Sequence, residues 1–127
     1  MFAVIYKFKL KPHQEELYKI HWNKIARYFI NHRGAIGSCL HQGENHTWVA
    51  YSRWPNKATR DNSWPGEHAP NNDLPDEIRD SIHFMQAIKA ENGTSDIAYE
   101  ELCLTVVEDF LLTSPGDSLE KYIDANI

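Results

Sequence analysis

The amino-acid sequence predicts one α+β domain, in which helices cover one face of an antiparallel sheet. Its 127 residues suffice for a single hydrophobic core and are too few for two ordinary domains. Residues 34–55 contain two runs of strand-forming residues, and the polar residues 43–46 between them are typical of a tight turn. This hairpin lies between two segments with helical periodicity, which is the arrangement of a split βαβ unit.

A strand is expected first, over residues 2–10, because apolar side chains alternate there with residues that become polar toward its end. Pro12 ends this strand. From residue 13 to 32 the period becomes helical, and one broad arc of the helix is apolar. Gly34 then supplies the left-handed residue that commonly ends a helix. The apolar arc holds Leu17, Tyr18, Ile20, Trp22, Ile25, Tyr28 and Phe29.

Asn56 is expected to cap a short helix that runs through Trp64. Pro75 marks the first turn of a second long helix, which ends near residues 92–93. Residues 97–112 alternate again and predict the last strand. The order βαββαβ predicts a ferredoxin-like domain over residues 1–112. Residues 113–127 form an extension with a short helix, which could serve as a docking arm.

Helices can cover only one face of such a sheet. The other face would hold Ile5, several aromatic side chains or Cys103, and it therefore needs a partner. We predict a homodimer in which two such sheets face each other.

Composition argues against several kinds of partner. The net charge is −5 and the thirteen lysines and arginines are scattered, so no surface for nucleic acid is expected. The N-terminus lacks the features of a signal peptide, and no apolar run is long enough to cross a membrane. We therefore expect a cytoplasmic protein with no membrane partner. Cys39 and Cys103 fall inside predicted strands, where we expect buried, reduced thiols.

Three stretches together resemble the antibiotic biosynthesis monooxygenase family of dimeric α/β barrels. They are VIYKFKLKP before a helix, HRGAIGSCLH, and WVAYSRWP before a short helix, and the resemblance covers about residues 2–110. It implies a dimer of ferredoxin-like protomers, each with a pocket between its helices and its sheet. The family includes cofactor-independent oxygenases of quinol-like aromatics, haem-degrading enzymes and proteins with no assigned activity.

His21 and Tyr6 are the candidate catalytic residues. His21 falls on the apolar arc of the first helix, where burial would keep its imidazole neutral and able to accept a proton from a phenol. The alternative is a core histidine bonded to a strand or to Tyr6, and the sequence favours it. Tyr6 faces the same way as Val4 and Phe8 and could orient a substrate oxygen, or it could simply fill the core.

Further candidates could contact a substrate. Trp64 could form a wall for a flat ligand or anchor a loop. On the hairpin, alternation puts His41 on the face of Cys39 and Tyr51 on the face of Arg53, but it does not say which face is inward. Arg53 is better explained by a salt bridge. The candidates for substrate contact are Trp22, Tyr28, His41, Tyr51, Arg53 and Trp64.

No cofactor or metal is expected. His68 lies in a loop and His83 off the apolar stripe of its helix, without the spacing of a known metal motif. For haem degradation, Trp64 could stand for the family's tryptophan, and His68 or His83 for its iron ligand. The strand position that should hold asparagine carries Tyr6, which argues against this activity.

Three functions follow from these residues and from the family resemblance. The first is cofactor-independent monooxygenation of a quinol-like aromatic, with His21 as base. The second is a non-catalytic protein that binds a small apolar molecule or acts in a stress response, with its pocket filled by the aromatic side chains. Haem binding or degradation is the third.

Overall fold

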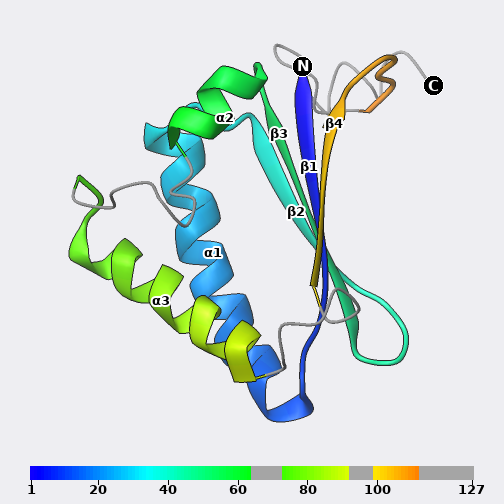
Figure 1. Ribbon diagram of the computed structural model, residues 1–127. Coiled ribbons are helices and arrows are strands. Elements are labelled where there is room, and N and C mark those ends of the chain that lie inside the picture. Colours follow the sequence, from blue (N-terminus) through cyan, green and yellow to red (C-terminus); the bar gives the residue numbers. More distant parts are fainter. Residues whose placement is uncertain (64–72, 92–98, 112–127) are drawn as a thin grey trace, which may run out of the picture.

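The computed structural model describes residues 1–63, 73–91 and 99–111, and it confirms the predicted α+β ferredoxin-like class. The described elements follow in the order βαββαβ with one added short helix (Figure 1). They are β1 (Phe2–Lys9), the 3-10 turn η1 (Pro12–Gln14), α1 (Glu15–His32), β2 (Gly37–Gln42), β3 (Thr47–Trp54), α2 (Lys57–Ser63), α3 (Asp76–Glu91) and β4 (Tyr99–Thr105).

The strands of the described residues form one antiparallel sheet in the order β2-β3-β1-β4. Figure 1 shows α1, α2 and α3 on the same side of this sheet. Phe2, Val4 and Phe8 are buried, so the even-numbered residues of β1 face the helices. Because paired residues share a face, the register fixes the facing of every other strand.

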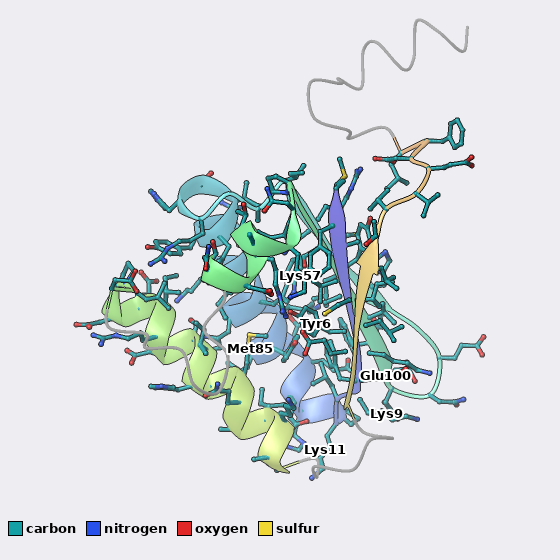
Figure 2. The ribbon with its side chains drawn as sticks, turned by 45° about the horizontal axis from the view of Figure 1, so that its top comes forward. Tyr6, Lys9, Lys11, Lys57, Met85 and Glu100 are labelled. Carbon is teal, nitrogen blue, oxygen red and sulfur yellow. The ribbon has the colours of Figure 1, made fainter. Side chains whose placement is uncertain are left out.

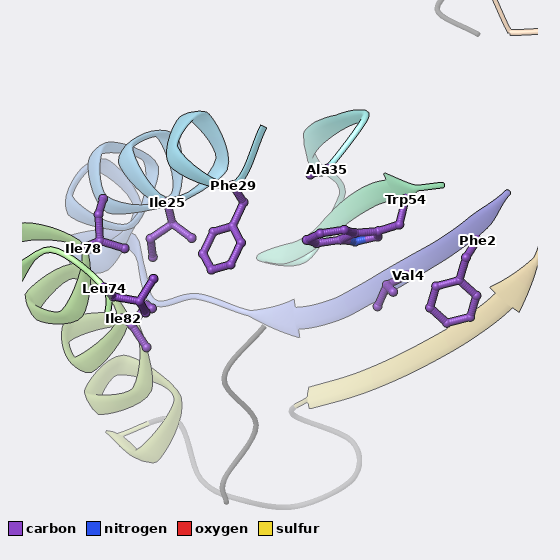
Figure 3. Packing of buried hydrophobic residues seen from close by; sticks show 9 residues of the cluster. All are labelled: Phe2, Val4, Ile25, Phe29, Ala35, Trp54, Leu74, Ile78 and Ile82. Carbon is purple, nitrogen blue, oxygen red and sulfur yellow. The ribbon is translucent and has the colours of Figure 1, made fainter. Parts of the chain in front are cut away.

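The core under the helices forms two clusters. The first lies around Val4 and Phe29, where Figure 3 shows side chains of β1 and β3 against those of α1 and α3. The second lies around Phe8 and Tyr18, at the other end of β1. Buried members are Phe2, Val4, Ile25, Phe29, Ala35, Trp54, Leu74, Ile78 and Ile82 in the first, and Phe8, Leu10, Tyr18, Trp48, Ala50 and Ile88 in the second.

The predicted helix boundaries are largely confirmed. Gly34 adopts a left-handed φ of 82° directly after α1. The side chain of Asn56 accepts a hydrogen bond of 2.8 Å from the backbone of Thr59, so it caps α2 as expected. The apolar arc of α1 is narrower than predicted: Leu17 is 48% exposed and Ile20 is 50% exposed. One helix face meets the sheet and another meets α3, so both side chains lie outside these contacts.

The last strand is shorter than predicted, because β4 ends at Thr105 and not near residue 112. Thr105 pairs with Phe2, and the amide of Val106 still donates to the carbonyl of Met1 at 3.0 Å. Asp109 instead forms an ion pair with the buried Arg53 of β3. The predicted extension, residues 113–127, lies outside the described residues.

The face of the sheet away from the helices, here called the open face, includes Ile5 as predicted. Leu102 and Leu104 of β4 share this face and are 44% and 41% exposed. Cys103 is opposite Val4 and therefore lies on the helix-facing side, so its predicted place on the open face is wrong. The prediction of buried thiols is also wrong, because Cys39 and Cys103 are both free and exposed.

Candidate functional site

The middle of the helix-facing side separates the two core clusters. Tyr6 of β1 and Met85 of α3 each pack against both clusters, and Figure 2 shows them on facing sides of these two elements. On β3, the small residues Ala50 and Ser52 lie opposite Tyr6 and Val4. Tyr6, Arg60 and Glu101 form polar contacts in this region between the two clusters, so we take it as the candidate site.

A cluster of three side chains joins the sheet to α2 here, and we call it the Tyr6–Arg60–Glu101 cluster. Arg60 donates a hydrogen bond of 3.0 Å to the hydroxyl of Tyr6 and forms an ion pair with Glu101 of β4. Its side chain is only 14% exposed. The cluster therefore holds a charged hydrogen bond in a largely desolvated place, where such bonds are strong.

Burial raises the pKa of the Tyr6 phenol above its ordinary value, and the Arg60 cation opposes part of this rise. Tyr6 is therefore a neutral phenol at physiological pH. Burial alone would lower the pKa of the Arg60 guanidinium, but its bonds to Tyr6 and Glu101 outweigh this effect and raise it. A hydroxyl that accepts a bond from a fixed cation becomes a better donor to another oxygen.

His21 lies on the side of α1 that faces α3. Its Nδ1 is 2.8 Å from the hydroxyl of the buried Ser81, and its ring stacks on Phe84 at 4.2 Å between centroids. The predicted alternative, a bond to a strand or to Tyr6, is therefore not the one observed for Nδ1. Burial, followed by the charge of Lys24, lowers the pKa of His21 below 6.5 and favours the neutral ring.

These contacts define what His21 can do chemically. When Nδ1 carries the proton and donates to Ser81, the lone pair of Nε2 is available to accept a proton. Stacking on Phe84 holds the ring in one plane. The group is thus a neutral imidazole with a fixed orientation, which is what a general base at physiological pH requires.

The structure does not bring the two other candidates of α1 together. Trp22 is partly buried and packs against the second cluster. Tyr28 packs against the first cluster, with its ring edge-on to Phe29 at 5.8 Å and tilted against His32 at 4.9 Å. Their places at opposite ends of the core leave their predicted contact with one substrate untested.

The hairpin candidates all lie on the open face. Tyr51 is opposite Ile5, and Arg53 lies next to the helix-facing Trp54 in β3. His41 of β2 is opposite Val49, which lies next to the helix-facing Ala50. Within one protomer the sheet therefore separates them from His21. Arg53 forms the ion pair with Asp109, in line with the salt-bridge interpretation. The predicted role of these residues in substrate contact remains a prediction.

The structure describes only some of the residues invoked for metal or haem. Trp64 and His68 lie outside the described residues, and His83 is exposed on α3, as its pattern predicted. Within residues 1–63, 73–91 and 99–111, no three histidine, cysteine or acidic side chains gather in a way that could hold a metal ion. In the same ranges no helix is long and apolar enough to span a membrane.

Sequence reasoning missed Arg60, Glu101, Ser81 and Phe84. Arg60 lies on a helix of seven residues, too short for a pattern to assign a buried face. Glu101 and Cys103 are two residues apart in β4 and therefore lie on the same face of the sheet. The pairing of β4 with β1 would have placed Glu101 beside Tyr6. The partners of His21 are about 60 residues away in sequence, and only the packing of α1 on α3 brings them together.

No family model and no curated protein matches this chain. Solved structures resemble it over most of its length. A candidate antibiotic biosynthesis monooxygenase from Chloroflexus aurantiacus is 14% identical, with a TM-score of 0.61, over 85% of this chain and 94% of its own. The cofactor-independent oxygenase SnoaB from Streptomyces nogalater, in a mutant form, is 12% identical, with a TM-score of 0.60, over 86% and 95%.

Another structure named antibiotic biosynthesis monooxygenase is 13% identical, with a TM-score of 0.59, over 85% of this chain and 100% of its own. Identities of this size establish the fold alone. The chain therefore has the ferredoxin-like fold of antibiotic biosynthesis monooxygenases, and the resemblance predicted from its sequence is confirmed at the level of the fold.

Proposed function

We propose that this protein is a cofactor-independent monooxygenase that acts on a small, quinol-like aromatic molecule. The observation that supports this most is the state of His21, a neutral imidazole held by Ser81 and Phe84 in the helix layer. The shared fold adds weight, because one protein with this fold is named as a cofactor-independent oxygenase.

The chemistry needs little from the protein. Nε2 of His21 takes the proton of a phenolic hydroxyl, and the electron-rich anion that results is the electron donor to O2. One oxygen atom of O2 forms a bond to a ring carbon and the other leaves as water. The aromatic substrate supplies all the electrons. The protein's part is to supply the base, to orient the ring and to exclude water from the anion.

Tyr6 is the proposed positioning residue for a substrate oxygen. Its neutral hydroxyl, polarised by Arg60 at 3.0 Å, can donate to the oxygen on which negative charge develops. Ala50, which lies opposite Tyr6 on the neighbouring strand, has a small side chain. Met85 packs against the same two core clusters as Tyr6 and could cover a flat ring.

The test is oxygen uptake with a panel of hydroquinones and anthrones. His21→Gln should reduce turnover by about 10²- to 10⁴-fold, which is the usual contribution of a positioned base. His83→Gln is the matched control, since His83 is an exposed histidine of the same fold, and it should leave turnover unchanged. Equal turnover in wild type and a folded His21→Gln variant would remove His21 from the mechanism.

We also propose the predicted homodimer, with contact centred on the β1–β4 side of the open face. Apolar side chains there are only partly covered in one protomer, namely Ile5, Leu102 and Leu104. Val107 and Phe110, which follow β4, are about nine-tenths exposed and would extend this surface. Sedimentation should give a dimer at micromolar concentration, and Leu104→Lys should shift it toward monomer; a wild-type monomer would contradict the proposal.

A non-catalytic role is the alternative, and one observation favours it. Tyr18 and Phe29 are buried in the core, and Trp22 packs against the second cluster, so much of the space between α1 and the sheet is filled. In that case no substrate on the panel would raise oxygen uptake above the blank. Binding of a hydroquinone, measured by calorimetry, would then separate a binding protein from a fully packed one.

A further inference from the structure

Two tryptophans of β3 are buried on the helix-facing side, and their indole N–H groups differ in hydrogen bonding. Trp48 is 3% exposed and Trp54 is 4% exposed. Nε1 of Trp54 donates a hydrogen bond of 3.2 Å to the hydroxyl of Ser52, two residues away on the same face of the strand. The corresponding neighbour of Trp48 is Ala50, whose side chain offers no acceptor. Nε1 of Trp48 is buried without a hydrogen-bond partner among the described residues.

A buried donor without an acceptor is unusual, because it loses its bond to water on folding and gains none in return. In native proteins such groups commonly pair with a bound molecule when no protein group is available. An indole N–H can only donate a hydrogen bond. The partner that the N–H of Trp48 lacks must therefore be an acceptor, and an oxygen atom of a ligand meets this need.

Trp48 is a neighbour of Tyr6 in the sheet. Trp48 lies opposite Phe8 and Ala50 lies opposite Tyr6, so Trp48 and Tyr6 are diagonal neighbours on the same face of two adjacent strands. Residues in this relation are about 7–8 Å apart, which is within reach of aromatic side chains. Tyr6 also packs against the second core cluster, to which Trp48 belongs. The phenol and the indole can therefore contact one ligand.

The same cluster extends toward His21. Phe84, on which the ring of His21 stacks, packs against the cluster of Trp48. Phe84, Met85 and Tyr6 are only partly buried, unlike the core of the cluster. Met85 has an unbranched side chain that adapts readily to the shape of a neighbour. The side chains around Trp48 on the helix side are thus the ones best able to admit a flat ring.

We infer that the indole N–H of Trp48 binds a second oxygen of the substrate and thereby selects aromatic molecules with two oxygens, such as hydroquinones, over phenols with one. The inference rests on the proposed function, since it concerns the same site and the same substrate. His21 and Tyr6 act on the hydroxyl that loses its proton, whereas Trp48 donates to the other oxygen of the ring. Trp48 is thus a specificity-determining residue and takes no part in the proton transfer.

Hydroquinone and p-cresol are the ligands that isolate this contact. They have nearly the same size and differ only in a hydroxyl that p-cresol replaces with a methyl group. The hydroxyl oxygen can accept the hydrogen bond of Trp48, whereas the methyl group leaves the N–H unpaired. One neutral hydrogen bond to a buried donor predicts that hydroquinone binds about tenfold more tightly than p-cresol.

The first experiment uses the wild-type chain and needs no variant that folds. The indole N–H signals are followed by NMR during titration with hydroquinone or p-cresol, without oxygen, so that no turnover occurs. Hydroquinone should move the Trp48 signal downfield, as a new hydrogen bond does, and p-cresol should not. The Trp54 signal is the internal control, because its N–H already has Ser52 as acceptor. A Trp48 signal that hydroquinone leaves in place, or moves no further than p-cresol does, would overturn the inference.

The second experiment measures the ratio of the two dissociation constants by calorimetry, again without oxygen. Trp48→Phe keeps an aromatic ring and removes the donor, so the preference of about tenfold for hydroquinone should disappear. Trp54→Phe is the matched control, a buried tryptophan on the same strand and face, and should keep the preference. A preference that persists in a folded Trp48→Phe variant would assign the selectivity to another group.

These measurements separate the inference from the proposed monooxygenase activity. If the wild type binds hydroquinone through Trp48 but takes up no oxygen with it, the inference stands and the monooxygenase proposal fails. If oxygen uptake occurs with a preference that Trp48→Phe does not change, the inference alone fails.

Discussion

Replacing Arg60 with glutamine would remove the cation that joins α2 to β1 and β4. The bond to the buried hydroxyl of Tyr6 has a charged donor, and such bonds contribute about 1.5–3 kcal/mol. Glu101 is 37% exposed, so its ion pair adds at most about 1 kcal/mol. The Nε of Arg60 is buried without a hydrogen-bond partner among the described residues, and its removal offsets part of the loss.

These contributions predict that Arg60→Gln lowers the free energy of unfolding by about 1–3 kcal/mol. Urea unfolding should show a lower midpoint with an unchanged slope. Arg79→Gln is the control, because Arg79 pairs with the exposed Asp76 one helical turn away and should cost less than about 0.5 kcal/mol. A loss for Arg60→Gln no larger than that of the control would refute the structural role of the cluster.

Other predictions concern single elements of the fold. Burial lowers the pKa of His21, so the native state favours the neutral ring; stability should fall as the pH drops below about 6.5, and less so in His21→Gln. An equal fall in both, measured by urea unfolding, would contradict this. Phe29→Ala should cost about 3–5 kcal/mol by the same method, whereas Leu17→Ala should cost less than about 1, and similar losses would refute the assignment of the core. Gly34→Ala should lower the melting temperature, because φ is 82° and a Cβ would lie 3.0 Å from Thr59; an unchanged value would exclude strain at this turn.

The secondary structure could be predicted because its signals are local. Strand alternation, the polar turn, the cap at Asn56 and the left-handed Gly34 all depend on a few neighbouring residues. The end of β4 could not be found in this way. It depends on pairing with β1, which ends at Phe2 and Thr105, whereas residues 106–112 remain largely apolar beyond this pair.

The candidate site was harder to predict, because its contacts join distant residues. Helical periodicity predicted the position of His21 around the axis of α1. That position alone does not say whether the side chain packs against the sheet or against another helix. The structure gives Ser81 and Phe84 of α3. Tyr6 was assigned to the correct face because three neighbours in the same strand share its parity and are buried.

The facing of the hairpin was open in the sequence, yet one further step would have decided it. Trp48 and Trp54 are the largest apolar residues of the third strand, and both have even numbers. If both are to be buried, every odd-numbered residue of that strand must lie on the open face. This alternation predicts that Tyr51 and Arg53 lie on the open face, and the structure agrees.

This parity has a consequence for function, because it divides the reactive side chains of the chain between two faces of one sheet. The helix-facing side holds Tyr6 and Arg60, with His21 in the helix layer above it. The open face holds Cys39 and His41. The β-sheet separates the side chains of the helix-facing side from those of the open face. A substitution on one face should therefore not alter the chemistry of the other face. His41→Gln should therefore leave oxygen uptake unchanged. A fall in oxygen uptake would mean that His41 acts on the same substrate as His21, which in this fold would require a second protomer.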